Sequence, residues 1–556
     1  MTSILNRRRF GQTAFAAFAS ACARQDGNDA HFVIHGGAIY TGLASRRTVQ
    51  AVRIENGRIA ALGSLEDARA GAAGVRLIDL GGGAAFPGFT DAHVHLTGVG
   101  LQAMMLDLVG VGSIAELQQR LRDYAAMHRE GAIVGRGWIE THWPERRFPT
   151  RADLDAVVGD RPVVLERIDG HASVANSAAL AAAQIDANTR DPDGGRIERD
   201  ASGGPTGMLI DNAANLVQGS LPQPTPAMLR QALAQAAQLY ASRGWVGVNN
   251  MSTSAREAAI YQELAQGGEL PLHADIYLTP EDAGSVLERG PYADPTGLVR
   301  VRGVKLYMDG ALGSRGAALL APYNDAPSSG LLVTPIEEMR EIMRRARAKG
   351  AQVATHAIGD RGNRLVLDAY RDTFADNPAS LRAARWRIEH AQVLSPADLP
   401  RFAQMGVIAS MQPSHAISDL HFAPARLGRE RLLGAYAWKP LLASGAVIAA
   451  GSDAPVEKGD PLIEFYAASY RHDLAGFAGP DWHLENAVTR EQAMRMLSWA
   501  PAFAAFADVE RGVLDVGKRA DLSAFSADLM AAAPSDIPAA QPVLTISGGR
   551  ITHQAA

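Results

Sequence analysis

Cysteine is nearly absent from this chain, because Cys22 is the only one among 556 residues. A single cysteine excludes an intrachain disulfide and a metal site built from several thiolates. Long apolar runs are lacking as well: no stretch of about 18 apolar residues follows the N-terminal segment, which argues against an integral membrane protein. The chain also lacks an excess of basic charge, since its net charge is −5 and its pI is near 6.3. We therefore expect no nucleic-acid partner.

The remaining composition is that of a globular protein. Hydrophobic residues make up 47% of the chain and charged residues 20%, which is ordinary for a folded domain. A chain of 556 residues is too long for one small core, but one large barrel with a smaller satellite domain would account for it.

The N-terminus, residues 1–22, has the features of an export signal. Arg7, Arg8 and Arg9 precede Phe10 and an Ala-rich apolar run, a pattern typical of a twin-arginine (Tat) signal. Ser20-Ala21-Cys22 resembles a bacterial lipobox, and the alternative is cleavage nearby with Cys22 incidental. We expect an exported bacterial protein that is either periplasmic or held at the membrane through a lipid anchor at Cys22.

Both ends of the chain have a β-rich pattern. Residues 51–55 and 58–62 alternate around Asn56-Gly57, the strongest short-range signal for a β-hairpin. Residues 520–525 and 543–551 have the same character. The sequence thus predicts a small composite β-sandwich from residues 31–86 and 505–556.

The middle of the chain alternates apolar strands with amphipathic helices, which predicts an α/β fold. Eight candidate strands occur, and that number predicts a (β/α)8 TIM barrel over residues 87–504. The connection between the first two strands is far longer than usual, so we expect a large insert after strand 1, a cap at about 100–243. The candidate strands are 84–95, 244–251, 271–278, 299–308, 351–357, 385–393, 406–413 and 446–454.

Metal-ligand residues stand at the ends of five of these strands. His93 and His95 are spaced i, i+2, so on a strand both imidazoles project from one face and can reach one ion. Taken alone, such a pair is more often two hydrogen-bonded histidines near a turn. Lys305 is an amine inside an apolar strand, where an unpaired ammonium is costly. It is expected to be deprotonated, salt-bridged or carbamylated, and a carbamate could bridge two cations.

Three further residues complete the candidate set. His356 and His390 would hold a second metal, and Asp453 is expected to be a ligand that also transfers protons, although a lone Asp at such a position is usually a helix N-cap. Histidine and carboxylate ligands without cysteine favour Zn²⁺, with Mn²⁺, Co²⁺ or Fe²⁺ as alternatives.

In combination, the motifs around these residues resemble the amidohydrolase superfamily, and within it the amidohydrolase-3 branch that includes N-substituted formamide deformylase. The similarity covers nearly all of residues 31–551. It is carried by PGFTDAHVH at 87–95, VKLYMDGALGSRGA from Val304, THAIGD at 355–360, IEHAQ at 388–392 and GSDAPV at 451–456.

The resemblance implies a binuclear centre with two divalent ions. His93, His95 and Asp453 would bind the more buried ion, His356 and His390 the other, and carbamylated Lys305 would bridge them. A hydroxide shared by the two ions would attack the substrate, with Asp453 as general acid and base. The absence of a His-x-x-Glu pattern after strand five makes a deaminase-type mononuclear site less favoured.

Four residues are candidates for substrate contacts. Trp138 and His171 lie in the insert, Arg315 follows strand four, and Gln412 follows strand seven together with Met411 and His415. For each, a structural role is the alternative.

The leading hypothesis is a metal-dependent hydrolase that cleaves a non-peptide C–N (amide) bond of a small molecule. The alternatives are hydrolysis of a cyclic amide, a carbamate or an ester at the same centre, and a non-catalytic ligand-binding lipoprotein. The sequence leaves the oligomeric state open, a homodimer being one alternative.

Overall fold

The computed structural model describes residues 31–45, 47–141, 143–167, 170, 172–192, 195–221 and 223–555. The predicted signal and Cys22 lie outside the described residues. Within the described part, no helix combines the length and the apolar character needed to cross a membrane.

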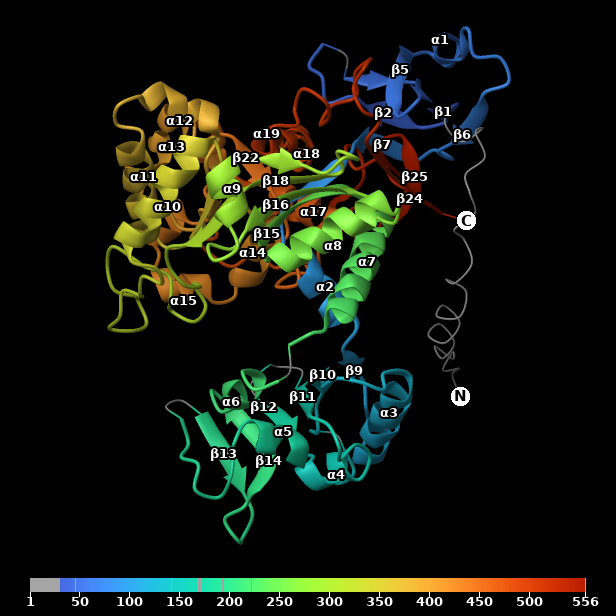
Figure 1. Cartoon of the computed structure of the whole chain (residues 1–556). Coiled ribbons are helices and arrows are strands. Elements are labelled where there is room, and N and C mark those ends of the chain that lie inside the picture. The colour runs from blue at the N-terminus through green and yellow to red at the C-terminus, as the bar shows by residue number, and fades with distance from the viewer. Residues whose placement is uncertain are drawn as a thin grey trace, which may run out of the picture.

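Eight parallel strands form the centre of the molecule (Figure 1). Each runs parallel to its neighbour, in the order β8-β15-β16-β18-β19-β20-β21-β22. Every one overlaps a candidate strand, so the prediction of a (β/α)8 barrel is confirmed as a nearly closed barrel. The strands are β8 (Phe89–Val94), β15 (Trp245–Thr253), β16 (His273–Leu278), β18 (Val299–Tyr307), β19 (Gln352–Ala357), β20 (Arg387–His390), β21 (Ile408–Met411) and β22 (Ile448–Ala450).

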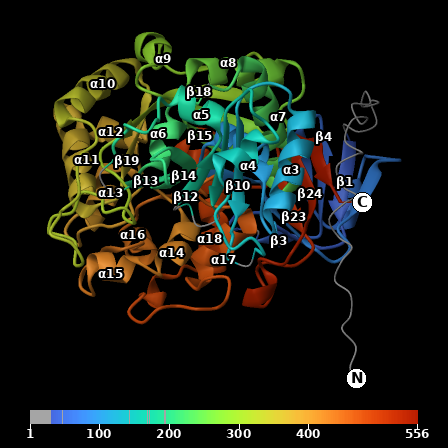
Figure 2. The same cartoon turned by 90° about the horizontal axis from the view of Figure 1, so that it is seen from below.

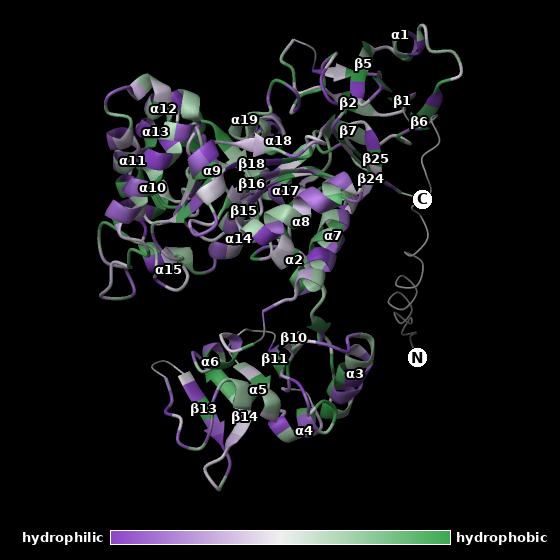
Figure 3. Cartoon of the chain, viewed as in Figure 1, coloured by the Kyte–Doolittle hydropathy of each residue, from purple (hydrophilic) through white to green (hydrophobic). Residues whose placement is uncertain are grey.

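Helices cover the outside of the barrel, and their sequences explain why. In α10 (Ile336–Lys349), Met339, Met343 and Ala346 recur at helical spacing and are buried, while Gly350 ends the helix with a φ of 65°. This is the amphipathic pattern of a helix that lies on a sheet, and Figure 3 shows hydrophilic and hydrophobic residues together on such outer helices. Others include α7 (Pro226–Ser242), α8 (Ala255–Gln266), α11 (Asp360–Thr373), α13 (Leu399–Met405), α16 (Trp438–Ala443) and α18 (Arg490–Leu497).

The two termini form two further sheets at one end of the molecule (Figure 1). The predicted hairpin is present: β4 and β5 pair around Asn56 and Gly57, whose φ values are 50° and 77°. Apolar residues of both sheets share one buried cluster. One sheet has the order β5 (Arg58–Gly63), β4 (Ala51–Glu55), β1 (His31–His35), β6 (Arg76–Asp79); the other has β25 (Arg550–Gln554), β24 (Pro542–Ser547), β23 (Leu522–Phe525), β7 (Ala84–Pro87), β2 (Ala38–Tyr40), β3 (Thr48–Val49).

The candidate strand 84–95 is wrong in one respect, because it divides between two sheets. Its first half, β7, pairs with β23 of the terminal sheet, and its second half, β8, begins the barrel. The break falls at Gly88, where a Cβ would lie 2.4 Å from a methyl carbon of Val246. Glycine is therefore required where the chain passes from one sheet to the other.

The segment between β8 and β15 contains a separate mixed sheet. Viewed from below, this insert lies in front of the barrel (Figure 2), and it follows the carboxyl end of β8, where a cap would be expected. Helix α7 lies within the predicted span of about 100–243, and it packs on α2 (Leu96–Ala103) and β15. The insert comprises β9 (Leu106–Asp107), α3 (Ile114–Met127), β10 (Ile133–Trp138), α4 (Arg151–Asp155), β11 (Val163–Arg167), β12 (Ala172–Ala175), α5 (Ser177–Ala182), β13 (Gly195–Arg199), β14 (Pro205–Asp211) and α6 (Ala214–Gln218).

Candidate metal centre

The carboxyl ends of five barrel strands bring the predicted ligands together. The Nε2 atoms of His93 and His95 lie 3.4 and 3.3 Å from Oδ1 of Asp453. The Nζ of Lys305 lies 3.4 Å from Nε2 of His93. The ring of His390 is centred 4.9 Å from that of His93 and 4.5 Å from that of His356. Six residues from distant parts of the sequence thus share one small volume.

Two of these residues have backbone conformations that are unusual for side chains other than glycine. The φ values of His390 and Asp453 are 72° and 59°, in the left-handed region that costs on the order of 1–3 kcal/mol per residue. His390 is the last residue of β20, and Asp453 follows the end of β22 by three residues. The change of direction turns each side chain toward the centre. Such strain is retained where the surrounding structure needs the side chain in one place.

Three imidazoles are oriented by a hydrogen bond at Nδ1. His93 donates to Oε2 of Glu389 over 2.6 Å, and His95 donates to the carbonyl oxygen of Met251 over 3.1 Å. His390 Nδ1 lies 2.8 Å from Oε1 of Gln412. Because Nδ1 carries the proton, each Nε2 is left with a lone pair directed at the centre. Metal-binding histidines are held in this way.

This arrangement fits a cation. The lone pairs on Nε2 of His93 and His95 face an acidic oxygen of Asp453, and acceptors that face one another at such distances repel unless a positive charge lies between them. Nε2 of His356 is buried, and no described residue forms a hydrogen bond with it. His93, His390 and Asp453 offer ligand atoms that all lie within 4.8 Å of one another. The donor set of imidazole nitrogens and carboxylate oxygen suits a divalent ion.

Burial keeps the nitrogen groups in the forms that bind metal. Desolvation lowers the pKa of His93 to about 4 and that of His356 to about 3, so both imidazoles are neutral at pH 7. Burial likewise lowers the pKa of Lys305 to about 8. At pH 7, Lys305 is therefore the free amine in a larger fraction of molecules than an exposed lysine would be. The free amine is the form able to react with carbon dioxide.

Arg387 and Glu389 form a buried network behind His93 that sequence reasoning missed. Burial alone would raise the pKa of Glu389, but the Arg387 guanidinium holds it well below its usual range. Arg387 also donates to Asn249 Oδ1 over 2.8 Å. Successive side chains of a strand point to opposite faces, so Glu389 and His390 are expected to face opposite sides of β20. The positive φ of His390 turns its side chain, so that both residues contact the group of candidate ligands. The sequence signal that could have indicated this role is an acidic residue, Glu389, directly before a histidine at a strand end.

The ends of the first and last strands meet at the centre and narrow the remaining opening of the barrel. Asp453 N donates to the carbonyl of His93 over 2.7 Å, and His95 N donates to that of Ala454 over 2.9 Å. Asp91 Oδ1 accepts N–H groups from His93 and Ser452 over 3.1 and 2.9 Å. The strand contacts that complete the fold are thus also the contacts that place His93 and Asp453.

Gly451 makes this close approach possible, and it provides a test. A Cβ at Gly451 would lie 2.3 Å from His93 N, so we expect Gly451→Ala to lower the free energy of unfolding by about 1–3 kcal/mol. Urea unfolding would measure the change. The control is Gly284→Ala, where a Cβ meets no described atom within 4 Å and stability should be maintained. Equal unfolding midpoints for Gly451→Ala and wild type would contradict a tight contact.

The four candidate substrate residues lie in different places. Trp138 is buried in the core of the insert, where its Nε1 donates to the carbonyl of Leu165 over 2.8 Å. Arg315 forms a bidentate pair with Asp325 over 3.0 and 2.9 Å. His171 lies outside the described residues. Gln412 is buried beside His390, so the structure places it as an orienting partner of a candidate ligand.

The position of Gln412 predicts an effect on metal binding. We expect Gln412→Leu to weaken metal affinity by about 10- to 100-fold, because His390 loses the group that orients it. Titration against a competing chelator would measure the affinity. Gln412→Glu keeps an acceptor beside Nδ1 and should bind metal more tightly than the leucine variant. A raised KM with unchanged metal affinity would instead indicate a substrate contact.

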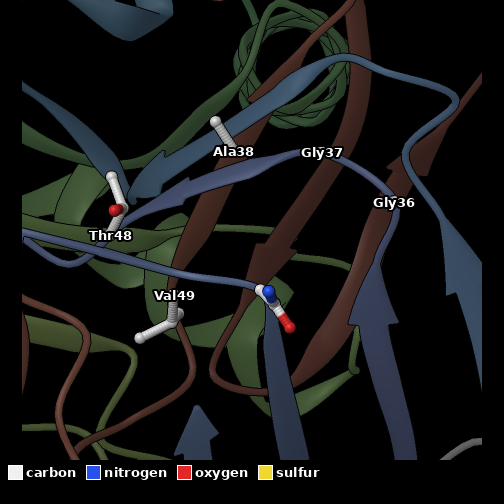
Figure 4. Close-up of a pocket in the computed structure, with 6 residues that line it drawn as sticks. Gly36, Gly37, Ala38, Thr48 and Val49 are labelled. Carbon is white, nitrogen blue, oxygen red and sulfur yellow. The ribbon is translucent and has the colours of Figure 1, made fainter. Parts of the chain in front are cut away.

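A hollow elsewhere in the chain differs in character from the centre. It has a volume of about 440 Å³ and is lined by Gly36, Gly37, Ala38, Thr48, Val49 and Gln50 (Figure 4). These residues belong to the turn after β1, to strands β2 and β3 of the terminal sheets, and to the link between β3 and β4. Their small or uncharged side chains contrast with the histidines and the carboxylate at the carboxyl ends of the barrel strands.

Comparison with known proteins agrees with this geometry. The family model Amidohydro_3, described as the amidohydrolase family, matches residues 76–553. The chain belongs to this amidohydrolase family. The resemblance inferred from the motifs is thereby confirmed.

Individual relatives match along nearly the whole chain. The Bacillus subtilis (strain 168) protein YtcJ is 34% identical over 533 residues, covering 94% of this chain and 99% of its own. N-substituted formamide deformylase of Arthrobacter pascens is 28% identical, covering 92% and 96%. A solved structure from Pyrococcus furiosus, titled an uncharacterized metal-dependent hydrolase, has a TM-score of 0.76 and 30% identity, covering 90% and 100%. Family and neighbours together support a metal-dependent amidohydrolase.

Proposed function

We propose that this amidohydrolase cleaves a non-peptide C–N bond, the amide of a small molecule. The observation that carries the proposal is the arrangement around Asp453, whose Oδ1 faces the lone pairs of His93 and His95 beside a buried Lys305. A carboxylate in this position can bind a cation and take up a proton, as amide hydrolysis requires.

The residues would hold two divalent ions, most favourably zinc. His93, His95 and Asp453 would bind one ion, and His356 and His390 the other. The Lys305 amine would attack carbon dioxide and lose a proton, and the resulting carbamate would bridge the pair. When bound, the ions supply a water of lowered pKa and polarise the substrate carbonyl.

The chain's own residues account for the proton transfers. Asp453 would accept a proton from the attacking water as the water oxygen bonds to the carbonyl carbon. It would return that proton to the leaving nitrogen as the C–N bond breaks, so the amine departs neutral and the carboxylate is regenerated. Glu389 and Gln412 would keep the imidazoles of His93 and His390 in place during these steps.

The name of one relative favours an open-chain amide. N-substituted formamide deformylase is similar to 92% of this chain, and its name describes removal of a formyl group from nitrogen. Hydrolysis of a cyclic amide, a carbamate or an ester remains the alternative, because the same centre would serve each of them.

A substrate screen tests the proposal. Protein reconstituted with Zn²⁺, Mn²⁺ or Co²⁺ would be assayed against N-formyl amines, N-acyl amines, lactams, carbamates and carboxylic esters of matched size. We expect the highest kcat/KM among the N-formyl and N-acyl compounds. Turnover of esters alone by fully metal-loaded protein would contradict cleavage of a C–N bond while leaving a hydrolase in place.

A further inference from the structure

His415 has a buried nitrogen that the steps described above do not use. It is the third residue of α14 (Pro413–Asp419), which follows β21 at the carboxyl end of the barrel. The side chain is nearly enclosed, with 8% of the residue exposed. Its Nε2 is buried and has no hydrogen-bond partner in the part of the chain that the structure describes. Buried polar atoms without a hydrogen-bond partner are rare, because leaving them unpaired costs free energy. We therefore expect this nitrogen to have a function.

The nitrogen is directed at the proposed proton carrier. Nε2 of His415 lies 3.6 Å from Oδ2 of Asp453, just beyond hydrogen-bond range. The imidazole is also stacked on that of His390, with ring centres 6.0 Å apart and planes inclined by 10°. His415 therefore lies on the side of the Asp453 carboxylate that is opposite to His93 and His95.

The two oxygens of Asp453 thus have different surroundings. Oδ1 faces the Nε2 atoms of His93 and His95, whereas Oδ2 faces His415. A carboxylate held on one side only can rotate about its last bond, and rotation would move the oxygen that must meet the attacking water. A donor at Oδ2 would prevent that rotation.

The helix that carries His415 is itself fixed. Ser414 N donates to Glu464 Oε2 over 2.9 Å, and Ser418 Oγ donates to Glu457 Oε1 over 2.6 Å. His415 lies between these two attachments. Its position relative to Asp453 is therefore determined by α14 as a unit.

We propose that His415 is a positioning residue for hydrolysis: its Nε2–H donates to Oδ2 of Asp453 during turnover and keeps Oδ1 directed at the ion site and the attacking water. The inference rests on the proposed function. His415 neither gains nor loses a proton, since the proton taken from water travels on Asp453 to the leaving nitrogen.

Two variants separate this role from simple packing. His415→Phe keeps a ring that can stack on His390 but removes the donor, and His415→Gln keeps an N–H near the position of Nε2. His421→Gln is the matched control, because His421 is exposed and pairs with Asp473 over 3.1 Å. If His415→Phe does not fold, His415→Leu takes its place.

The kinetic test uses the amide that wild type cleaves fastest in the substrate screen. We expect His415→Phe to lower kcat by about 100-fold, with KM within threefold and metal content unchanged. His415→Gln should recover at least about tenfold of that loss, and the control should retain wild-type kcat. Equal kcat in the phenylalanine variant and wild type would overturn the proposal, as would a glutamine variant no better than phenylalanine. An effect confined to KM would overturn it too, by assigning His415 to substrate.

Crystal structures of the metal-loaded proteins give a readout that needs no substrate. In wild type, Oδ2 of Asp453 should lie within hydrogen-bond distance of His415 Nε2, and in His415→Phe the carboxylate should be rotated. An unrotated carboxylate would overturn the proposal. If wild type cleaves no amide, the proposed function fails on its own, and this structural comparison still decides whether His415 positions Asp453.

Discussion

Replacing Asp453 with Asn should lower kcat by about 10³-fold while the protein remains folded. An amide has nearly the shape of the carboxylate, but it cannot take the proton of the attacking water or return it to the leaving nitrogen. The buried position of Asp453 beside His93 and His95 leaves little room for bulk water to substitute as the base. Steady-state kinetics on the best amide substrate, with metal content measured on the same samples, would test this.

The same variant separates an enzyme from a binding protein. A ligand-binding lipoprotein has no turnover to lose and would keep its ligand affinity in Asp453→Asn. The control is Asp123→Asn, on the exposed side of helix α3, which should match wild type in every measurement. Full activity in Asp453→Asn with a normal metal content would remove Asp453 from the mechanism.

Replacing Lys305 with Met should be nearly as damaging, for a different reason. Methionine fills the buried space, but it cannot form the carbamate that would bridge the two ions. We expect metal content to fall from about two ions per chain to about one or fewer, and kcat to fall by at least about 10³-fold, because the water then lacks its second cation. Elemental analysis and kinetics would follow the two effects together.

Bicarbonate provides a complementary test of the modification. Reconstitution of wild type with added bicarbonate should raise activity, and ¹³C-labelled bicarbonate should give a carbamate NMR signal that Lys305→Met lacks. Lys349→Met, at the exposed end of α10, should retain both the signal and the activity. A wild-type protein with full metal content and no carbamate signal would show that Lys305 acts as an unmodified amine.

Much of the barrel could be predicted from the chain because its strands are short apolar runs that end in polar, chemically distinctive residues. All eight candidate strands overlap observed ones. The division of residues 84–95 could not be predicted, since its apolar character continues across Gly88. Only the position of Val246 in the fold shows why that glycine ends one strand and begins another.

The limits of the insert were harder to predict for a similar reason. Helix α7 lies in the long connection after β8 and has the same amphipathic character as the helices around it. Its contacts with α2 and β15 place it on the barrel. The local sequence of a helix does not indicate which other elements it contacts.

The candidate centre was predictable to the extent that each residue carried its own chemical signal. His93, His95, Lys305, His356, His390 and Asp453 could be listed because imidazoles, an amine and a carboxylate at strand ends are unusual. The supporting roles of Glu389 and Gln412 could not be predicted, since they depend on contacts that only the fold creates. Glu389 contacts His93 at the end of β8, and Gln412 contacts His390 at the end of β20. Trp138 shows the converse, because a tryptophan in a motif gives no indication of whether its ring faces a ligand or a core.

We expect this chain to hold divalent ions between these strand ends and to require them for hydrolysis. Elemental analysis of purified, active protein, before and after treatment with a chelator, tests it most directly. We expect about two transition-metal ions per chain, loss of activity when they are removed, and recovery when Zn²⁺ or another divalent ion is returned. Folded protein that is fully active with no bound transition metal would contradict it.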